Sequence, residues 1–500
     1  MKNKRLPIAE LHDFDLDSGL DKPLYLQLAD AIRTRILSGR FPAHCHLPPT
    51  RTMAGMLALG RNTVNNAYEV LRSEGLLEAR QGSGFYVSAN LDPILVPSGK
   101  RATSTEPTPM KASPKVLDID QRPTPREIKP FTPGIPDLDA FPLDLWARLS
   151  AKQWRQASRA MLTYASPTGY QPLREAIAAY LKACRGVVCD PDQVLVVSGS
   201  QQGLDLTCRL LLAPYDAVWV ENPCYQGFLG TLRQCQAHVI PVELDGEGLD
   251  VRAGQRIHGN PKLVFVTPAH QYPTGTEMTM PRRLELLNFA QKSGSWILED
   301  DYDSEFRYDG PPLAAIQGLA PESRVIYTGT FSKVLFPALR IGYLVVPKRL
   351  VGALSELRYL VDNSSPTINQ AVLADFIDQG HFASHLRRMR QRYRARRDQV
   401  CEWLRHNQAH HFETGPHSGG MHVTLFAKVP FDDTAFAETA VHCNLEIRPL
   451  SPYYRGKRKS SGLVLGFAGF DETRIKQALG RLDQCLNHYF ATPQASYMVR

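Results

Sequence analysis

The sequence predicts two folded parts of different class, a small helical module that ends in a β-hairpin and a large α/β body. Three observations predict this division. Helical periodicity runs through residues 23–75, proline accumulates over 91–130, and short strand-like runs alternate with helical stretches after residue 131. Strands separated by helices are typical of a largely parallel sheet.

Length and composition limit the class of protein. The chain has 500 residues, of which 43% are hydrophobic and 22% charged, as in globular proteins of more than one domain. No apolar run approaches the roughly 20 residues that a membrane span needs. The start, MKNKRLPIAELHDFD, lacks the apolar stretch of a secretory signal. We therefore expect a cytoplasmic protein that does not enter a membrane.

The nine cysteines are scattered along the chain, and most of them lie in apolar segments. This pattern predicts buried free thiols in a reducing compartment. No second pair and no histidine cluster completes a zinc site.

The N-terminal module begins with two predicted helices. Over residues 23–38, one helical face collects the apolar side chains Leu24, Leu28, Ala31, Ile32 and Ile36. A short helical piece, RTMAGMLAL, follows LPPT and ends before Gly60.

A third helix, RNTVNNAYEVLRSEG, follows Gly60 and should stop at Gly75. Its apolar side chains recur at helical spacing and predict the buried face Val64, Ala67, Tyr68 and Leu71. The segments LLEAR, QGSG and FYV then predict a strand, a tight turn and a strand.

The opposite face of this third helix suits a DNA groove. Near its N-terminal end it carries Arg61, Asn62, Asn65 and Asn66. Arginine binds guanine and asparagine binds adenine through paired hydrogen bonds, although a merely solvated face would look the same. Residues 22–90 contain eight Lys or Arg and four Asp or Glu, a net charge of +4 that favours a polyanionic partner.

Helix, helix, turn, helix and hairpin in this order are typical of a winged helix-turn-helix. Residues 22–90 closely resemble the GntR-type DNA-binding domain, in PLYLQLADAIRTRILSGRF, LPPTR, GRNTVNNAYEVLRSEGLL and RQGSGFYV. The resemblance implies that double-stranded operator DNA is bound by Arg51, Thr52, Arg61, Asn62, Thr63, Asn65 and, through the backbone of the wing, Gly82.

Residues 91–130 predict a semi-extended linker. They contain eight prolines and no aromatic residue, as in STEPTPMKASPK. Such a segment buries too little apolar surface to fold alone.

The body, residues 131–500, carries five motifs that follow strand-like runs. Each alone also fits an ordinary loop, but their order places all five at the ends of successive strands, where ligands bind in such sheets. They are SGSQQGLD (198–205), ENPCY (221–225), HQYPTG (270–275), SWILEDDYDSEF (295–306) and VIYTGTFSKVLFPALRIGYLV (325–345).

Together these motifs resemble the fold-type I enzymes that use pyridoxal 5'-phosphate (PLP). The resemblance implies a Schiff base between PLP and Lys333, with Asp300 at the pyridine nitrogen, Tyr302 at the ring hydroxyl and Tyr225 stacked on the ring. Asp301 competes with Asp300 for the nitrogen. The residues implied at the phosphate are Ser200, Gln201, Thr330, Ser332 and Arg340.

The segment LTYASPTGYQPLREAIAAYL resembles the family segment whose tyrosine reaches the phosphate of the other subunit. This implies a homodimer with shared PLP sites, to which Tyr164 contributes. A GntR-type reader, a proline-rich linker and an aminotransferase-like body in this order resemble the MocR/GabR type of bacterial transcription regulators. In that type, PLP bound through an aldimine at the lysine, sometimes followed by an amine or amino acid effector that takes over the aldimine, alters how the dimer holds its operator DNA.

The chain departs from active aminotransferases at two points. Tyr272 precedes the PTG turn where those enzymes carry Asn, and SSGLVLGFAGF lacks an Arg at the position that binds the substrate carboxylate. Arg448 and Arg455 are nearby candidates for that role. We therefore expect low or no transaminase turnover.

Three hypotheses remain at this stage. The leading one is a PLP-dependent regulator, the second a working aminotransferase that also binds DNA, and the third a DNA-binding protein with an inert dimerisation body. The sequence leaves open the operator, the effector and the sign of regulation.

Overall fold

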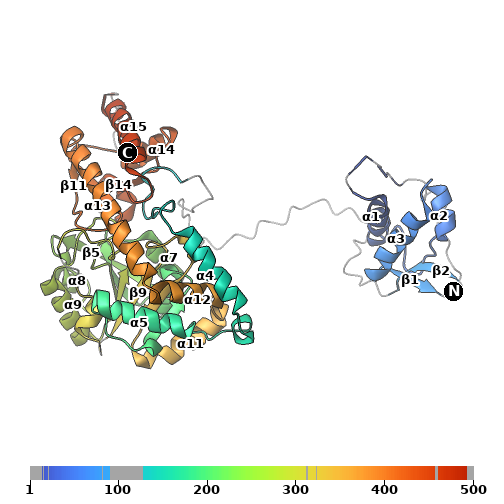
Figure 1. The fold of residues 1–500 in the computed structure, drawn as a ribbon, viewed down its shortest axis with the longest axis horizontal. Coiled ribbons are helices and arrows are strands. Elements are labelled where there is room, and N and C mark those ends of the chain that lie inside the picture. The colour runs from blue at the N-terminus through green and yellow to red at the C-terminus, as the bar shows by residue number, and fades with distance from the viewer. Residues whose placement is uncertain are drawn as a thin grey trace. The chain divides into compact units, whose positions relative to one another are not determined.

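The computed structural model describes residues 14, 16–17, 19–20, 22–80, 83–89, 128–310, 313–321, 324–456 and 460–491. The chain divides into two compact units, residues 1–114 and 115–500, each of which is described by itself (Figure 1). Apart from residues 128–130, the predicted linker 91–130 lies outside the described residues.

The N-terminal unit has the predicted order of three helices and a hairpin. Its elements are α1 (Leu24–Leu37), α2 (Thr50–Met56), α3 (Arg61–Ser73), β1 (Leu77–Arg80) and β2 (Gly84–Val87). The two strands pair antiparallel. The predicted buried face of α3 is confirmed, because Val64, Ala67, Tyr68 and Leu71 are all buried. Gly75 follows the helix with a φ of 75°, a conformation that glycine adopts without strain.

The face of α1 differs slightly from the prediction. Leu28, Ile32 and Ile36 are buried as expected, but Ala29 is buried with them, while Leu24 and Ala31 are half-buried. The helix therefore turns its apolar stripe a little further toward α3 than the spacing alone indicated.

The C-terminal unit is built on a large, mostly parallel sheet, which confirms the predicted class. The strands lie in the order β3-β10-β9-β8-β7-β4-β5-β6. The pairs from β5 through β4, β7 and β8 to β9 are parallel, whereas β10 is antiparallel to both neighbours and β6 to β5. The strands are β3 (Val194–Val197), β4 (Ala217–Asn222), β5 (His238–Asp245), β6 (Gly248–Leu249), β7 (Leu263–Val266), β8 (Trp296–Asp301), β9 (Val325–Thr330) and β10 (Gly342–Val345).

Helices cover both faces of this sheet, which is why its central strands are buried throughout. Leu195 and Val197 face one layer, and Val194 and Val196 face the other. The first layer holds α6 (Ser200–Leu211), α7 (Gln226–Gln234) and α11 (Lys348–Asp362). The second holds α5 (Gln171–Arg185), α8 (Val251–Ile257), α9 (Met280–Ser293), α10 (Ile316–Leu319) and α12 (Thr367–Asp378).

A smaller antiparallel sheet of order β11-β12-β14-β13 forms the C-terminal part. Figure 1 shows its labelled strands with α14 and α15 at one end of the unit. The remaining elements are α4 (Leu143–Arg155), α13 (His381–Asn407), β11 (Phe412–Thr414), β12 (His422–Ala427), α14 (Asp433–His442), β13 (Arg448–Pro449), β14 (Gly462–Gly466) and α15 (Glu472–Ala491).

Two further predictions from the sequence concern the cysteines and membrane-spanning segments. Cys443 and Cys485 form a disulfide, so the prediction of free thiols is wrong for this pair, which the fold brings together across 42 residues of sequence. Among the remaining cysteines, Cys184 is exposed. None of the helices in the described part of the chain combines the length and apolarity that a membrane crossing requires.

Candidate functional site

A pocket opens at the carboxyl ends of the central strands, where the five sequence motifs were expected to lie. Its walls come from both the large sheet and the small C-terminal sheet. The lining residues are Pro133, Gly134, Ser200, Tyr225, Thr267, Tyr272, Asp300, Tyr302, Asp303, Lys333, Met421 and His422. Five predicted site residues are thus brought together: Ser200, Tyr225, Asp300, Tyr302 and Lys333.

Lys333 lies in the turn that follows β9. Its Nζ donates a hydrogen bond to the Gly134 carbonyl oxygen at 3.1 Å. Burial lowers the pKa of this amine, while the Asp303 and Asp300 carboxylates act in the opposite direction. Gly134 has a φ of 73°, a conformation that glycine adopts without strain, and a Cβ there would lie 2.7 Å from Nζ. The site therefore holds an amine with a lowered pKa, which favours its nucleophilic form.

The two adjacent carboxylates at the end of β8 have different surroundings. Asp301 is buried in an ion pair with Arg185 at 2.8 Å and accepts a hydrogen bond from the Tyr327 hydroxyl at 2.5 Å. Asp300 faces the pocket, and its Oδ1 is buried without a hydrogen-bond partner among the described residues. Burial, together with the Asp301, Asp303 and Glu221 carboxylates, raises the pKa of Asp300 to about 8. Of the two carboxylates, Asp300 is the one that lines the pocket and can meet a ligand.

The N-terminus of α6 forms another side of the site. The helix begins at Ser200, directly after Gly199, whose φ of 98° directs the chain from β3 into the helix. A Cβ at position 199 would lie 3.3 Å from the Arg340 guanidinium, which places that cation beside the helix start. A helix N-terminus next to an arginine is a suitable place for an anion.

Three other residues predicted at the phosphate, Ser332, Thr330 and Gln201, differ in the hydrogen bonds of their side chains. The Ser332 Oγ is buried without a hydrogen-bond partner in the described part of the chain. The Thr330 Oγ1 accepts a hydrogen bond from the Ser332 backbone N–H at 3.1 Å. The Gln201 side chain points away, because its Nε2 donates to the Thr231 hydroxyl at 2.9 Å. Gln201 can therefore offer its backbone N–H to a phosphate, whereas its side-chain amide nitrogen is already hydrogen-bonded to Thr231.

Three tyrosine rings line the pocket. Tyr272 meets both Tyr225 and Tyr302 edge-on, with ring centroids 6.1 and 5.9 Å apart. The Tyr272 hydroxyl lies 3.1 Å from the Tyr453 hydroxyl, which fixes its position. These rings give the pocket flat walls, a suitable shape for a planar ligand.

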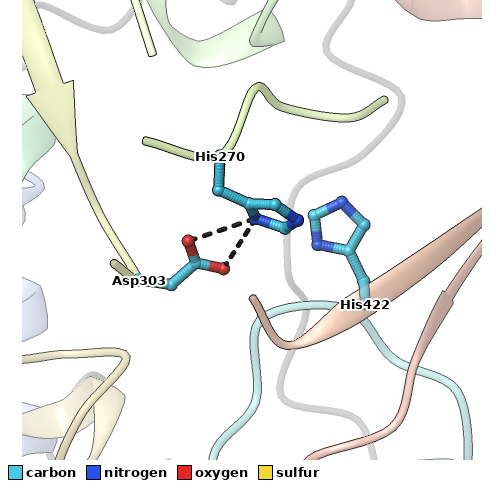
Figure 2. A group of neighbouring side chains, drawn as sticks. All are labelled: His270, Asp303 and His422. Atoms are coloured by element: carbon cyan, nitrogen blue, oxygen red, sulfur yellow. Dashed lines mark hydrogen bonds and ion pairs between the residues drawn. The ribbon is translucent and has the colours of Figure 1, made fainter. Parts of the chain in front are cut away.

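The sequence missed a buried group beside these tyrosines, namely His270, Asp303 and His422 (Figure 2). His270 Nδ1 lies 3.2 Å from both carboxylate oxygens of Asp303. His422 reaches the site from β12, about 120 residues further along the chain than Asp303. His270 and Asp303 stand inside motifs that the sequence singled out, but no sequence signal pointed to His422.

Seven predicted residues are not among the lining residues, namely Gln201, Thr330, Ser332 and Arg340, described above, and Tyr164, Arg448 and Arg455. Tyr164 is 91% exposed on the single chain. Arg448 forms an ion pair with Glu446 at 3.0 Å, and Arg455 donates to Gln226 Oε1 at 2.9 Å. Both arginines are thus paired with other side chains in this structure.

The residues predicted to face DNA form an exposed surface on the N-terminal unit. Arg51, Thr52, Arg61, Asn62 and Asn65 are exposed, and Thr63 is half-buried. The Tyr68 hydroxyl donates to the Pro48 carbonyl oxygen at 3.0 Å, which ties α3 to the turn before α2. Gly82 lies outside the described residues.

Comparisons with known families assign both units. Residues 24–87 match "Bacterial regulatory proteins, gntR family", and residues 134–482 match "Aminotransferase class I and II". The first family indicates DNA binding, and the second covers more than half of the chain.

Several similar proteins are transcription regulators, and their similarity extends over nearly the whole chain. The "Probable rhizopine catabolism regulatory protein MocR" of Rhizobium meliloti is 38% identical over 474 residues, which cover 93% of this chain and 94% of that protein. The "HTH-type pyridoxine biosynthesis transcriptional regulator PdxR" of Corynebacterium glutamicum is 30% identical, with 92% and 95% covered.

Among solved structures, the kynurenine aminotransferase of Pyrococcus horikoshii, in complex with PMP, is 28% identical with a TM-score of 0.68, and covers 74% of this chain and 93% of its own. LysN, an α-aminoadipate aminotransferase of Thermus thermophilus complexed with N-(5'-phosphopyridoxyl)-L-leucine, is 27% identical with a TM-score of 0.68, and covers 73% and 93%.

Proposed function

The chain belongs to the MocR type of GntR-family transcription regulators, and from this premise we propose that it binds PLP and a small amine or amino acid and adjusts its hold on operator DNA accordingly. The observation that carries the proposal is the Lys333 amine in one pocket with the Asp300 carboxylate, whose buried Oδ1 has no hydrogen-bond partner among the described residues, in a chain that also presents a DNA-binding domain.

The residues present fit PLP. Asp300 would lie at the ring nitrogen, because its buried Oδ1 has no partner in the described part of the chain. Tyr225 would stack on the ring and Tyr302 would hold the ring hydroxyl, since both line the pocket. The phosphate would meet the start of α6 and the side chains of Ser332 and Arg340, with Thr330 behind them.

When bound, PLP supplies an aldehyde that condenses reversibly with a primary amine. Lys333 would hold that aldehyde, because its amine lies in the pocket with a lowered pKa. The tyrosine walls restrict the cofactor to one plane. An effector amine would compete with Lys333 for the same aldehyde, which gives the protein two liganded forms.

We propose a homodimer for the assembled protein. The exposed Tyr164 is the residue that would reach the phosphate of the partner subunit's site, which is consistent with its 91% exposure on the single chain.

We also propose a cytoplasmic location, because a regulator acts where its operator lies. A preference of the dimer for one geometry, when the effector is bound, would change its affinity for DNA.

On the DNA side, we propose that α3 enters the major groove with Arg61, Asn62 and Asn65 toward the base edges. Arg51, Thr52 and Thr63 would contact phosphates, and the backbone near Gly82 would approach the minor groove. The exposure of the described members of this set supports the assignment.

Lys333→Ala tests the proposal, with Lys292→Ala as a matched control on the exposed end of α9. Wild-type protein incubated with PLP should gain visible absorbance and should bind its promoter differently with and without PLP. Lys333→Ala should lose both responses, while DNA binding by the N-terminal unit persists. Wild-type protein that binds its promoter with the same affinity with and without PLP would contradict the proposal. Sustained keto-acid production from an amino donor would instead favour an active aminotransferase.

A further inference from the structure

A chain of three polar side chains leads from a buried carboxylate to the pocket. His270 Nδ1 lies 3.2 Å from both oxygens of Asp303 and 3.1 Å from the Tyr302 hydroxyl oxygen (Figure 2 shows the first two contacts). His270 and Asp303 are only 3% and 2% exposed, so water does not replace these contacts. Tyr302 and Asp303 also line the pocket.

The contacts determine which nitrogen of His270 carries hydrogen. A ring nitrogen that faces a carboxylate on both oxygens must bear a hydrogen, because a lone pair there would be repelled. Nδ1 therefore donates toward Asp303 and has no lone pair to offer. Nδ1 carries a single hydrogen, so in the contact with Tyr302 this hydrogen is shared between the Asp303 carboxylate and the hydroxyl oxygen, both of which accept. The tyrosine's own proton is then left for another acceptor.

We propose that His270, held by Asp303, is a positioning residue that donates its Nδ1–H to the Tyr302 oxygen and so directs the tyrosine proton into the cofactor pocket. This inference rests on the proposed function, because the acceptor in the pocket is the ring oxygen of PLP. A hydroxyl that accepts one hydrogen bond donates the next one more strongly. His270 therefore strengthens the contact between Tyr302 and the cofactor.

His422 completes the environment of the pair. Its Nε2 lies 3.0 Å from the Pro273 carbonyl oxygen, so Nε2 carries hydrogen and donates. Burial and the neighbouring His270 lower the pKa of His422 to about 3, which keeps this ring neutral. Its Nδ1 lone pair consequently lies on the side that faces the unpartnered Nε2 of His270 (Figure 2).

Asp303 and His422 thus lie on opposite nitrogens of the His270 ring. Asp303 is hydrogen-bonded to His270, whereas His422 faces the other ring nitrogen and is hydrogen-bonded to the Pro273 carbonyl oxygen. The titratable groups that face His270 are Asp303, Glu277, Tyr302 and His422, and Arg185 and Arg307 line the same small cavity, with Arg307 paired to Glu277. The Asp303 carboxylate raises the pKa of His270 against the effect of burial. These neighbours keep hydrogen on Nδ1 across the physiological range.

The test uses full-length protein loaded with PLP and reads the pH titration of its visible absorbance. A hydrogen bond donated to the ring oxygen stabilises the deprotonated form and lowers the titration midpoint. Asparagine can place a donor where Nδ1 stands, whereas glutamine places its amide where Nε2 stands. His270→Gln should therefore raise the midpoint by about one pH unit, and His270→Asn should keep the wild-type midpoint.

A double variant shows whether His270 acts through the tyrosine. Tyr302→Phe should raise the midpoint at least as far as His270→Gln, and the double variant should match Tyr302→Phe alone. An unchanged midpoint in His270→Gln would overturn the inference, as would a shift that persists undiminished in the Tyr302→Phe background. If wild-type protein takes up no PLP, the proposed function itself fails, and this outcome is distinct from both.

Discussion

The DNA-facing surface and the cofactor pocket are both polar, but they are built in opposite ways. The surface residues lie within one short segment, Arg51 to Asn65, and water satisfies their exposed groups. The pocket gathers side chains from Pro133 to His422. Among the described residues, buried polar atoms of Asp300 in the pocket, and of Ser332 and His270 next to the lining residues Lys333 and Tyr302, have no hydrogen-bond partner. Unsatisfied buried groups cost stability, so they indicate a ligand more strongly than an exposed polar face does.

The same substitution at two adjacent carboxylates should separate structure from ligand binding. Asp301→Asn removes the charge that faces the buried Arg185 guanidinium, so it should lower the free energy of unfolding by about 3–5 kcal/mol. Asp300→Asn removes a buried carboxyl whose charged form is disfavoured by its surroundings, so the unfolding free energy should be unchanged or higher, while PLP affinity falls. Chemical denaturation without PLP and titration with PLP measure the two effects. Equal destabilisation by both substitutions would contradict the distinction.

The pH dependence of stability sharpens the same contrast. Burial raises the pKa of Asp300 from 3.8 to about 8, so the folded protein binds this proton more tightly than the unfolded chain. Its stabilising contribution is full below pH 3.8 and is lost as the pH rises toward 8. The melting temperature of PLP-free wild-type protein should therefore fall more steeply over this range than that of Asp300→Asn.

PLP supplies the control for this prediction. A partner at the ring nitrogen would stabilise the charged carboxylate, so loading with PLP should bring the wild-type slope down to that of the variant. Identical slopes without PLP would show that Asp300 does not titrate as its surroundings indicate.

The two regions also differ in how far the sequence could predict them. Helical spacing was enough for the buried face of α3, because Val64 and Tyr68 are positioned by local geometry. The positions of Asp300 and Lys333 at the ends of predicted strands were enough to predict that both line one pocket. His422 was missed because it enters from another sheet, and its approach depends on the packing of two subdomains. The Cys443–Cys485 disulfide was missed because the packing of α14 beside α15, within the C-terminal part, brings the two cysteines together.

Two arginines of the N-terminal unit should differ in the kind of binding that they support. Arg61→Ala, at the start of α3, should weaken operator binding by about 1–3 kcal/mol and relax its sequence preference. Arg51→Ala should weaken binding to all sequences alike and reduce the salt slope by about one. Binding to operator and to unrelated DNA over a range of salt concentrations separates them.

Arg72→Ala is the matched control, because Arg72 is exposed in the last turn of α3 and pairs with Glu69 at 2.9 Å. It should leave both affinity and salt slope near the wild-type values. An Arg61→Ala variant with unchanged operator affinity would contradict the proposed docking of α3.

The smallest predicted effect concerns the hydrogen bond that joins the two halves of the DNA-facing surface. Tyr68→Phe removes the hydroxyl that donates to the Pro48 carbonyl at 3.0 Å but keeps the buried ring, so the N-terminal unit should lose about 1 kcal/mol of stability. Because this bond fixes α3 relative to the turn before α2, operator affinity should fall slightly while PLP uptake stays unchanged. Tyr25→Phe on the half-buried side of α1 is the control, and both variants can be compared by thermal unfolding. A loss of PLP uptake in Tyr68→Phe would show that the two units are coupled, whereas independent units require that only DNA binding respond.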